Sequence, residues 1–451
     1  MTKQYNRREF LKVSGVALGA AGMVGITLPG ATAVYAQSNE KPVRLGFVGI
    51  GGRGSYHLDV ALGIPGVKVP ALCEIREDRL QRAKAWVEQA GQRSPTLYGK
   101  SETDFRRMIE TEDLDAVICA TNWKWHTPVC LAAMRNAKHA VTEVPTVQTV
   151  EEAWDIVETH EKTGYWATLG LEQVLMESRD GVYLAILNMI RQGWFGDIIH
   201  AEGGYIHDLR LVKHDPEREP WRLKHSIERN GNLYPDHPMN RIMPYLGVNH
   251  GDRFEQIVSV SSRPGMLNEY AREYYGPNHP NVTKEMKQGD YNASLIRTVN
   301  GKLVTLNFDT NTPHPRGLFR LQGSAGVFLD GRGLGGPKVY FDGISPEEHQ
   351  WEPADDYLAE FRHPLLKSYN PPEREAIRGH GSGSRKTPIT WHLLIRNLRE
   401  GTMPYFDVYD SVTSSVTSPL SERSVANHNR PVEFPDFTRG KWESRPPIIF
   451  G

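Results

Sequence analysis

The feature that most constrains the fold is a glycine-rich turn placed directly after a short apolar run. Residues 43–48 read Val-Arg-Leu-Gly-Phe-Val, and Gly49-Ile50-Gly51-Gly52-Arg53-Gly54 follows without a gap. The run is typical of a buried parallel strand, and the glycine spacing is that of a turn that opens a helix. Gly49 permits the tight turn, Gly51 lets a phosphate approach the backbone, and Gly54 lets the helix pack on the strand. The pattern predicts a dinucleotide-binding unit with the pyrophosphate at the helix N-terminus.

An acidic residue ends the next apolar run, which covers residues 67–73. It is Glu74, twenty residues after Gly54. An acid at this place accepts hydrogen bonds from a ribose diol and repels a 2′-phosphate, so it selects NAD over NADP. Arg76 is the one basic residue nearby that can bind a 2′-phosphate, and it keeps NADP open as the minor alternative.

Helix and strand patterns then alternate along the chain, which predicts a doubly wound α/β Rossmann domain over residues 37–165. Helices are expected at 77–90, 127–136 and 150–163, and strands at 115–120, 139–142 and 167–171, the last leading out of the domain. Residues 166–451 are expected to form an α+β domain that binds substrate and makes oligomers, built on an open, mostly antiparallel sheet. Its strands are predicted at 200–205, 256–262, 294–298, 303–309, 318–322 and 339–341, and the chain after Ser421 is expected to be irregular.

The first 36 residues have the pattern of an export signal. Arg7-Arg8-Glu9-Phe10-Leu11-Lys12 precedes a mildly apolar, Gly- and Ala-rich stretch that ends at Ala36. This pattern predicts a cleaved twin-arginine signal peptide and a periplasmic or extracellular protein without a membrane span in its mature form. An uncleaved membrane anchor is the alternative, although Pro29 and the glycines are unfavourable in a spanning helix.

Charge and cysteine content exclude several other classes of function. Removal of residues 1–36 takes away four basic residues and one acidic residue, which changes the net charge from −1 to −4 and argues against nucleic-acid binding. Cys73, Cys119 and Cys130 lack the spacing of metal ligands, so we predict three core thiols and no metal site.

Several long motifs identify a family. In chain order they are Thr121-Asn122-Trp123-Lys124-Trp125-His126-Thr127-Pro128, Glu143-Val144-Pro145, Tyr205-Ile206-His207-Asp208-Leu209-Arg210, Trp221-Arg222, Asn230-Gly231-Asn232-Leu233-Tyr234-Pro235-Asp236-His237, Gly251-Asp252-Arg253-Phe254 and Pro435-Asp436-Phe437-Thr438-Arg439-Gly440. Together they resemble glycoside hydrolase family 109, the NAD-dependent alpha-N-acetylgalactosaminidases, a branch of the Gfo/Idh/MocA oxidoreductase superfamily. Many dehydrogenases of this superfamily have a lysine where Val144 stands, so Glu143-Val144-Pro145 favours the glycosidase branch.

The resemblance implies two sets of site residues. The cofactor set, with the fingerprint glycines included, consists of Gly49, Gly51, Gly52, Arg53, Gly54, Glu74, Trp123, Lys124, Trp125, His126, Glu143, Val144 and Gln173. The sugar set consists of Tyr205, Arg222, Tyr234 and His237. Two members of the sugar set have a purely structural alternative, because Tyr205 fits a strand that packs on its sheet and His237 fits a turn cap.

Three segments depart from the family pattern. A family tyrosine is absent after Leu171-Glu172-Gln173, where Met176 stands, and Arg316 takes the place of another. Gly379-His380-Gly381 continues as Ser382-Gly383-Ser384, where the family has Gly-Met-Asp. All three segments are expected to shape the sugar pocket.

The mechanism that the resemblance implies is transient oxidation at sugar C3, elimination of the C1 leaving group, addition of water and re-reduction. His237 is the candidate base for the C3 hydroxyl, Tyr234 assists it, and Arg222 polarises a sugar oxygen. Glu143 is a candidate to hold the nicotinamide ribose or a sugar hydroxyl. Tyr205 is the candidate base for the C2 proton, because Met176, which stands at the family tyrosine position, cannot accept a proton.

The alternatives are an exported sugar oxidoreductase with net hydride transfer and a non-catalytic sugar-binding protein that retains NAD. By analogy we also expect a homo-oligomer.

Overall fold

The computed structural model describes residues 41–169, 171, 181–331, 335–371, 373–375, 384–386 and 388–448. For residues 373–375 and 384–386 the description is of the backbone alone. The predicted signal peptide, the cofactor candidate Gln173, Met176 and the segment 379–384, apart from Ser384, lie outside the described residues.

The first domain is a parallel sheet with helices on both faces, as predicted. Its six strands lie in the order β3-β2-β1-β4-β5-β6, and every neighbouring pair is parallel. The strands are β1 (Val43–Val48), β2 (Val67–Cys73), β3 (Thr96–Tyr98), β4 (Ala116–Cys119), β5 (His139–Thr142) and β6 (Ala167–Thr168). The helices are α2 (Gly52–Leu62), α3 (Glu77–Gln89), α4 (Phe105–Thr111), α5 (His126–Arg135) and α6 (Val150–Thr163).

The boundaries of these elements follow local signals in the sequence. The strand at 67–73 and the helix at 150–163 have the predicted limits. Thr149 caps α6, because its side chain accepts a hydrogen bond from Glu152 N, and Gly164 ends the helix at φ +77°. The predicted domain limit at residue 165 was too early, since β6 pairs with β5 and belongs to the first sheet.

The second domain contains a nine-stranded sheet in the order β14-β13-β12-β11-β7-β10-β9-β8-β17. Among the strands that the structure describes in this sheet, β10 and β7 pair in parallel, and the remaining pairs are antiparallel. The strands are β7 (Ile198–Ile206), β8 (Phe254–Ser261), β9 (Asn292–Thr298), β10 (Leu303–Asp309), β11 (Leu318–Gly323), β12 (Gly326–Leu329), β13 (Lys338–Phe341), β14 (Glu352–Pro353) and β17 (Val432–Glu433). A short hairpin, β15 (Glu373–Glu375) with β16 (Ser384–Lys386), lies apart from this sheet. The predicted open, mostly antiparallel sheet is confirmed.

Helices of the second domain carry much of the site, and their limits were not predicted. They are α8 (Val182–Arg191), α9 (Arg210–His214), α10 (Trp221–Glu228), α11 (Asp236–Leu246), α12 (Met266–Tyr275), α13 (Asp355–Glu360), α14 (Pro364–Ser368), α15 (Ile389–Glu400) and α16 (Val408–Ala426). The chain after Ser421 is less irregular than expected, because α16 continues to Ala426 and β17 joins the sheet edge.

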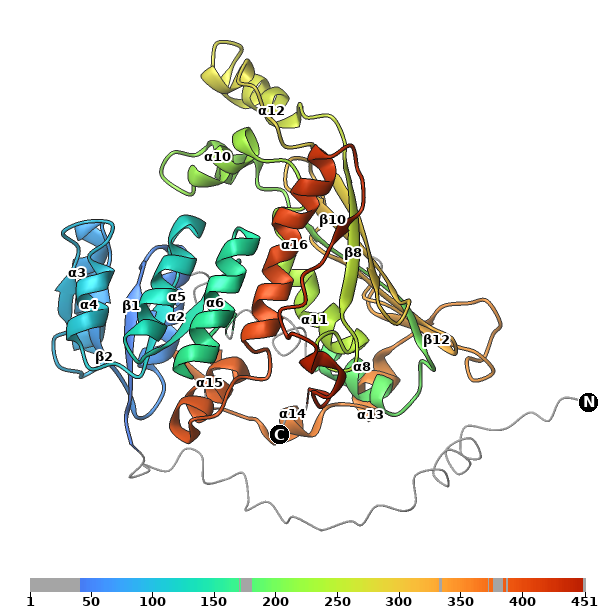
Figure 1. Cartoon of the computed structure of the whole chain (residues 1–451), viewed down its shortest axis with the longest axis horizontal. Helices are drawn as coiled ribbons and strands as arrows, with labels where there is room; N and C mark the ends of the chain where they lie inside the picture. The colour runs from blue at the N-terminus through green and yellow to red at the C-terminus, as the bar shows by residue number, and fades with distance from the viewer. Residues whose placement is uncertain are drawn as a thin grey trace, which may run out of the picture.

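Helix α16 joins the two domains. It lies between α6 and β8 (Figure 1) and is buried over most of its length. Its serines accept backbone N–H groups from both sides: Ser411 from Leu169 and Ser415 from Thr146 in the first domain, Ser421 from Asn232 and Ser424 from Ser259 in the second. A buried helix that satisfies polar groups of both domains fixes their relative position.

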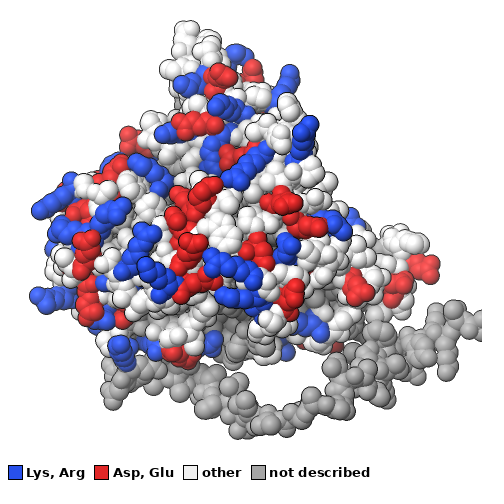
Figure 2. Space-filling model, in the orientation of Figure 1, with Lys and Arg blue, Asp and Glu red and all other residues white. Residues whose placement is uncertain are grey.

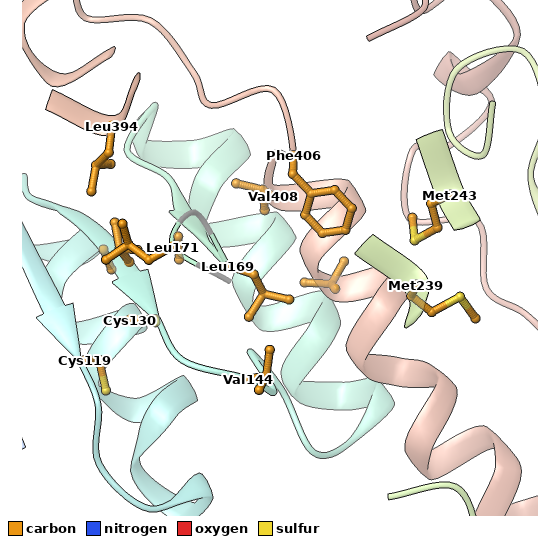
Figure 3. Close-up of a cluster of buried hydrophobic side chains, with 14 of the residues drawn as sticks. Cys119, Cys130, Val144, Leu169, Leu171, Met239, Met243, Leu394, Phe406 and Val408 are labelled. Carbon is orange, nitrogen blue, oxygen red and sulfur yellow. The ribbon is translucent and has the colours of Figure 1, made fainter. Parts of the chain in front are cut away.

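An apolar core continues across this junction. Figure 3 shows Val144 and Leu169 of the first domain opposite Phe406 and Val408 at the start of α16, with Met239 of α11 beyond them. All five are buried. Cys73, Cys119 and Cys130 are also buried and free, as predicted, and burial raises the pKa of the Cys73 thiol to about 12.

Charged side chains of both signs are mixed over the visible face, and neither sign forms a broad field there (Figure 2). Within the described ranges, no helix combines the length and the hydropathy that a bilayer span requires.

Candidate functional site

The glycine-rich turn has the geometry that its spacing predicted. Gly49 has φ +81°, and a Cβ at that position lies 2.8 Å from the carbonyl oxygen of Ala120. A Cβ at Gly54 lies 1.9 Å from the carbonyl oxygen of Gly49. Both positions therefore exclude any side chain, which keeps β1, β4 and α2 in close contact.

The first turn of α2 fits a pyrophosphate. Gly51 precedes the helix without a capping side chain, and the first turn contains no acidic residue. A Cβ at Gly52 has no heavy atom within 4 Å, so the space in front of the helix is open. The free N–H groups and the helix dipole attract a phosphate there.

Glu74 lies beside this turn, where a ribose is expected. Its carboxylate accepts the backbone N–H of Ile50 at 2.7 Å and that of Arg76 at 2.9 Å. Since a carboxylate can accept about four hydrogen bonds, both oxygens keep capacity for hydroxyl donors. The residues at this edge of the sheet thus fit an NAD dinucleotide.

Arg53 and Glu143, both predicted to contact the cofactor, form an ion pair with each other. Arg53 Nε and His57 Nε2 lie 2.9 Å and 2.6 Å from the same oxygen, Glu143 Oε1. Burial acts against the charge of Glu143, but Arg53 and His57 hold the pKa of this carboxyl well below its ordinary value. The ion pair joins the start of α2 to the end of β5, beside the glycine-rich turn where the cofactor is expected to bind.

The segment that follows β4 contributes to the site mainly through Trp123. Its ring lies 4.5 Å from that of His225, 5.2 Å from that of Trp221 and 5.4 Å from that of Tyr234. Trp123 thus connects the cofactor domain directly to α10 and to the predicted sugar residues of the second domain.

The other cofactor candidates of this region have different surroundings. His126 is buried, with its ring nitrogens 2.7 Å from Pro145 O and 3.1 Å from Thr121 O, so this ring holds the two loops together. Val144 is also buried. Lys124 extends over the ring of Trp125 on the exposed surface. Backbone carbonyls face both nitrogens of His126, and its contact with the cofactor stays a prediction.

Three of the four predicted sugar residues form one aromatic stack. The Tyr205 ring lies 4.2 Å from the Tyr234 ring and 4.9 Å from the His237 ring, with which it makes an angle of 15°. Tyr234 and His237 are also stacked, at 4.9 Å. Tyr205 comes from β7, and His237 lies in the first turn of α11. A tyrosine and a histidine on one face can hold and move protons at a bound sugar.

Arg222, the fourth residue, closes this cluster from α10. Its guanidinium lies 5.6 Å from the centre of the Tyr234 ring and forms an ion pair with Glu219. Burial opposes its charge, but Tyr234 and Glu219 hold the pKa of Arg222 above its ordinary value. Arg222 is therefore a permanent cation beside the stack.

His207 was missed as a site residue. Its Nδ1 lies 3.1 Å from the hydroxyl of Tyr205. Burial, with Arg316 and Arg222 nearby, lowers the pKa of His207 to about 4, so its ring is neutral at neutral pH and able to share a proton with Tyr205. His207 directly follows β7, and its spacing of two residues from Tyr205 was the available signal, because residues at i and i+2 of an extended chain share a face. Arg316, which stands at a family tyrosine position, thus acts electrostatically on this cluster.

Two buried charged groups behind the cluster were also missed. Lys213 donates to Ser226, Thr310 and Asn311, and it connects α9 and α10 to the end of β10. Asp236 precedes His237 and accepts hydrogen bonds from two serines of α16. Asp236 stands within a quoted motif, but the partners of both residues are far away in the sequence, so no local pattern predicted these contacts.

Comparisons with known proteins agree with this geometry. Residues 43–171 match the oxidoreductase family with an NAD-binding Rossmann fold, and residues 178–444 match the C-terminal domain of glycosyl hydrolase 109. A glycosyl hydrolase family 109 protein of Solibacter usitatus is 36% identical over 98% of this chain and 99% of its own length. The alpha-N-acetylgalactosaminidase of Tannerella forsythia is 34% identical over 98% of this chain and 99% of its own.

Solved structures share the fold at lower identity. A levoglucosan dehydrogenase in complex with NADH and L-sorbose superposes with a TM-score of 0.64, at 20% identity, over 88% of this chain and all of that one. An oxidoreductase domain protein from Kribbella flavida gives a TM-score of 0.65 at 19% identity, with the same coverage.

The full-length relatives, the matched C-terminal domain and the dinucleotide fold lead to one assignment. The chain belongs to glycosyl hydrolase family 109 and is an NAD-dependent glycoside hydrolase.

Proposed function

We propose that the protein removes a terminal alpha-N-acetylgalactosaminide, or a related sugar, by transient oxidation at C3, elimination at C1, addition of water and re-reduction. One observation carries this proposal. Trp123 of the cofactor domain lies against Tyr234, which stacks with Tyr205 and His237. The groups that can move protons therefore stand directly beside the dinucleotide edge. A relative of this chain has the name alpha-N-acetylgalactosaminidase, which supports the choice of sugar.

The aspartate and glutamate side chains near this stack are engaged with other protein groups, which supports a mechanism other than the usual one with a pair of catalytic carboxylates. In the described part of the chain, Asp208 forms an ion pair with Arg210, and Glu219 forms one with Arg222. Asp236 accepts hydrogen bonds from α16, on the side of the junction between domains. Proton transfer by tyrosine and histidine fits oxidation and elimination better than protonation by an acid pair.

NAD fits the edge formed by Gly51, Gly52, Glu74 and Trp123, and when bound it supplies the hydride acceptor and donor for C3 of the sugar. His237 accepts the proton of the C3 hydroxyl as this carbon is oxidised, since a neutral imidazole nitrogen can accept a proton. Tyr234, stacked on His237, orients the ring. The cation of Arg222 polarises the oxygen at C3 or C2.

Tyr205 and His207 carry out the next step, which is removal of the proton from C2. A carbonyl at C3 acidifies the C2–H bond, and Tyr205 removes this proton as its own hydroxyl proton passes to its hydrogen-bonded partner His207. The C1–O bond then breaks, a C1–C2 double bond forms, and the aglycone leaves with a proton. Water adds across the double bond, its oxygen to C1 and a proton to C2. C3 would then be reduced again, and His237 would return the proton to the C3 oxygen, so the net reaction is hydrolysis.

The test uses the holoprotein with an aryl alpha-N-acetylgalactosaminide in deuterated water. We expect aglycone release, no net NADH, and deuterium at C2 of the released sugar. Net NADH without aglycone release would identify a sugar oxidoreductase instead. Sugar binding with neither release nor exchange at C2 would identify a non-catalytic binding protein.

We also propose that residues 1–36 direct the folded chain through the twin-arginine export route. Arg7 and Arg8 support this proposal. Replacement of both by lysine is expected to retain the full-length chain in the cytoplasm, as followed by fractionation and immunoblotting. Export of the double variant at the wild-type rate would contradict the proposal.

A further inference from the structure

A buried carboxyl group adjoins the candidate base His237 and has no role in the steps above. Asp236 is 1% exposed, in the first turn of α11. Its Oδ1 accepts the hydroxyls of Ser414 and Ser415, each at 2.8 Å. Among the described residues, no lysine or arginine forms an ion pair with it at 4 Å or less.

The hydrogen bonds around Asp236 have a fixed direction. Ser415 has one hydroxyl proton, which it donates to Asp236, so its oxygen accepts the backbone N–H of Thr146 at 2.9 Å. The chain therefore runs from Thr146 N–H to Ser415 and from Ser415 to Asp236. Two donors on one oxygen favour the carboxylate form, whereas burial raises the pKa of Asp236 to about 6.

This chain of hydrogen bonds connects the two halves of the site. Thr146 lies three residues after Glu143, whose ion pair with Arg53 borders the cofactor edge. Asp236 lies one residue before His237, whose ring stacks on Tyr205 and Tyr234. Ser415 of α16 is the bridge between them, and it is buried.

His237 gains a positive charge when it accepts the sugar proton, and its half-buried ring lies against two tyrosine rings, where a lone charge is costly. The titratable and charged groups around it are the two tyrosines of the stack, His207, Arg222, Asp208, Glu219 and Asp236. Arg222 is a cation, His207 is neutral, and Asp208 and Glu219 are already paired with arginines, so Asp236 is the group in this set that can balance the new charge.

We propose that Asp236 is a positioning residue that balances the charge on His237 during proton transfer, and that Ser415 couples it to the cofactor loop through Thr146. This inference rests on the proposed function of His237. The charges of Asp236 and His237 act on each other, and the hydroxyls of Ser414 and Ser415 hold the carboxylate in place.

The test compares Asp236→Asn with the wild-type holoprotein. Asparagine can still accept both serine hydroxyls with its carbonyl oxygen, but it carries no charge. We expect kcat for the aryl glycoside to fall about 10- to 100-fold with KM nearly unchanged, less than the roughly 10²- to 10³-fold loss for a donor that contacts the reacting atoms directly. The acidic limb of the pH profile of kcat should move to lower pH, because a proton on His237 is then less stabilised.

Two further variants separate this role from a structural one. Ser414→Ala removes one hydrogen-bond donor to Asp236. It should move the acidic limb of the pH profile of kcat to lower pH as well, by a smaller amount. Asp330→Asn is the matched control, since Asp330 is a buried carboxylate that accepts a hydroxyl, from Tyr183 at 2.8 Å, outside the site. It should leave the profile at its wild-type position.

A readout that needs no turnover separates this proposal from the proposed function. The titration of the His237 imidazole, followed by NMR in the holoprotein, should move to lower pH in Asp236→Asn. If the wild type releases no aglycone, the proposed function fails while this titration still tests the charge coupling. An unchanged titration and pH profile in both Asp236→Asn and Ser414→Ala would overturn the inference. If Asp236→Asn does not fold, Ser414→Ala alone decides.

Discussion

Arg53 Nε lies 2.9 Å from Glu143 Oε1, and this ion pair joins the first turn of α2 to the end of β5. Glu143→Gln removes the charge that Arg53 and the buried His57 share. Because Arg53 is 37% exposed, we expect a loss of about 2 kcal/mol in the free energy of unfolding, below the 3–5 kcal/mol typical of fully buried pairs. Urea unfolding followed by tryptophan fluorescence measures the change.

The free energy of unfolding of Glu143→Gln should also depend less on pH in the acidic range than that of the wild type. The pKa of Glu143 is lower in the folded state than in the unfolded chain, so its contribution is present above the unfolded value of about 4.3 and declines as pH falls below it. Wild type and Glu143→Gln should therefore converge in stability toward low pH. The exposed pair of Lys124 with Glu102 provides the control, and Glu102→Gln should leave stability unchanged within error. A constant difference between wild type and Glu143→Gln at all pH values would contradict the assignment.

Two glycines of the turn should respond differently to alanine. Gly54→Ala places a Cβ 1.9 Å from the carbonyl oxygen of Gly49, so we expect a protein that fails to fold or loses several kcal/mol, roughly the effect of severe core overpacking. Gly52→Ala meets no atom within 4 Å and should fold normally. Its methyl group enters the space in front of α2, so the NAD content after purification should fall about tenfold, which corresponds to about 1.4 kcal/mol of binding.

Measurement of the nucleotide released by acid, together with circular dichroism, tests both variants. Full NAD content in a folded Gly52→Ala protein would place the pyrophosphate elsewhere. A stable Gly54→Ala protein would show that the contact between α2 and β1 can relax.

The elements that the sequence predicted well are those with a periodic or apolar pattern. The strand at 303–309 and the helix at 150–163 have the predicted ends because flanking turns and caps mark them. Strand β3 has three residues and was missed, since so short a segment has little pattern. Helix α16 was missed for another reason: it is buried nearly all round and rich in serine and threonine, so it lacks an amphipathic period.

The same distinction, between features with and without a local sequence signal, holds for the residues of the site. Family motifs predicted that Tyr205, Tyr234 and His237 face the sugar, and the structure brings these three residues together. The contact between Asp236 and Ser415 spans 179 residues and depends on how α16 lies between the domains. Only tertiary packing creates such a pair, so no local sequence pattern predicts it.

Lys213 should make stability depend on pH in the alkaline range. It is 3% exposed and donates to three neutral oxygens, and burial, followed by the charge of Arg222, lowers its pKa to about 7. The unfolded chain, in which a lysine pKa is about 10.4, binds more protons between these values. The free energy of unfolding should therefore rise with pH in this window, by up to about 1.4 kcal/mol per pH unit.

Lys213→Met removes this titration. The stability difference between wild type and Lys213→Met should change in favour of the wild type from about pH 7 to about pH 9, as measured by urea unfolding at each pH. Lys302→Met is a comparison, because Lys302 forms an ion pair with Asp252 and is 26% exposed. An equal pH dependence in wild type and Lys213→Met would show that Lys213 keeps an ordinary pKa.

Tyr205 provides the sharpest test of the reaction sequence, because it is assigned to only one of the two proton transfers. Tyr205→Phe keeps the stacked ring and removes the hydroxyl that binds His207. We expect kcat for aglycone release to fall about 10²- to 10⁴-fold, the usual effect of losing a general base. Oxidation at C3 should persist, since His237 is unchanged, so bound NADH should accumulate without deuterium exchange at C2.

A matched control for this variant is Tyr274→Phe, which changes a 62% exposed tyrosine on α12 and should behave as wild type. Loss of both NADH formation and C2 exchange in Tyr205→Phe would assign its hydroxyl to the oxidation step. Deuterium exchange at C2 at the wild-type rate in Tyr205→Phe would instead show that another group removes the C2 proton, with His207 the first candidate. His207→Asn then decides between them, because it removes the proton acceptor and keeps the side-chain position polar.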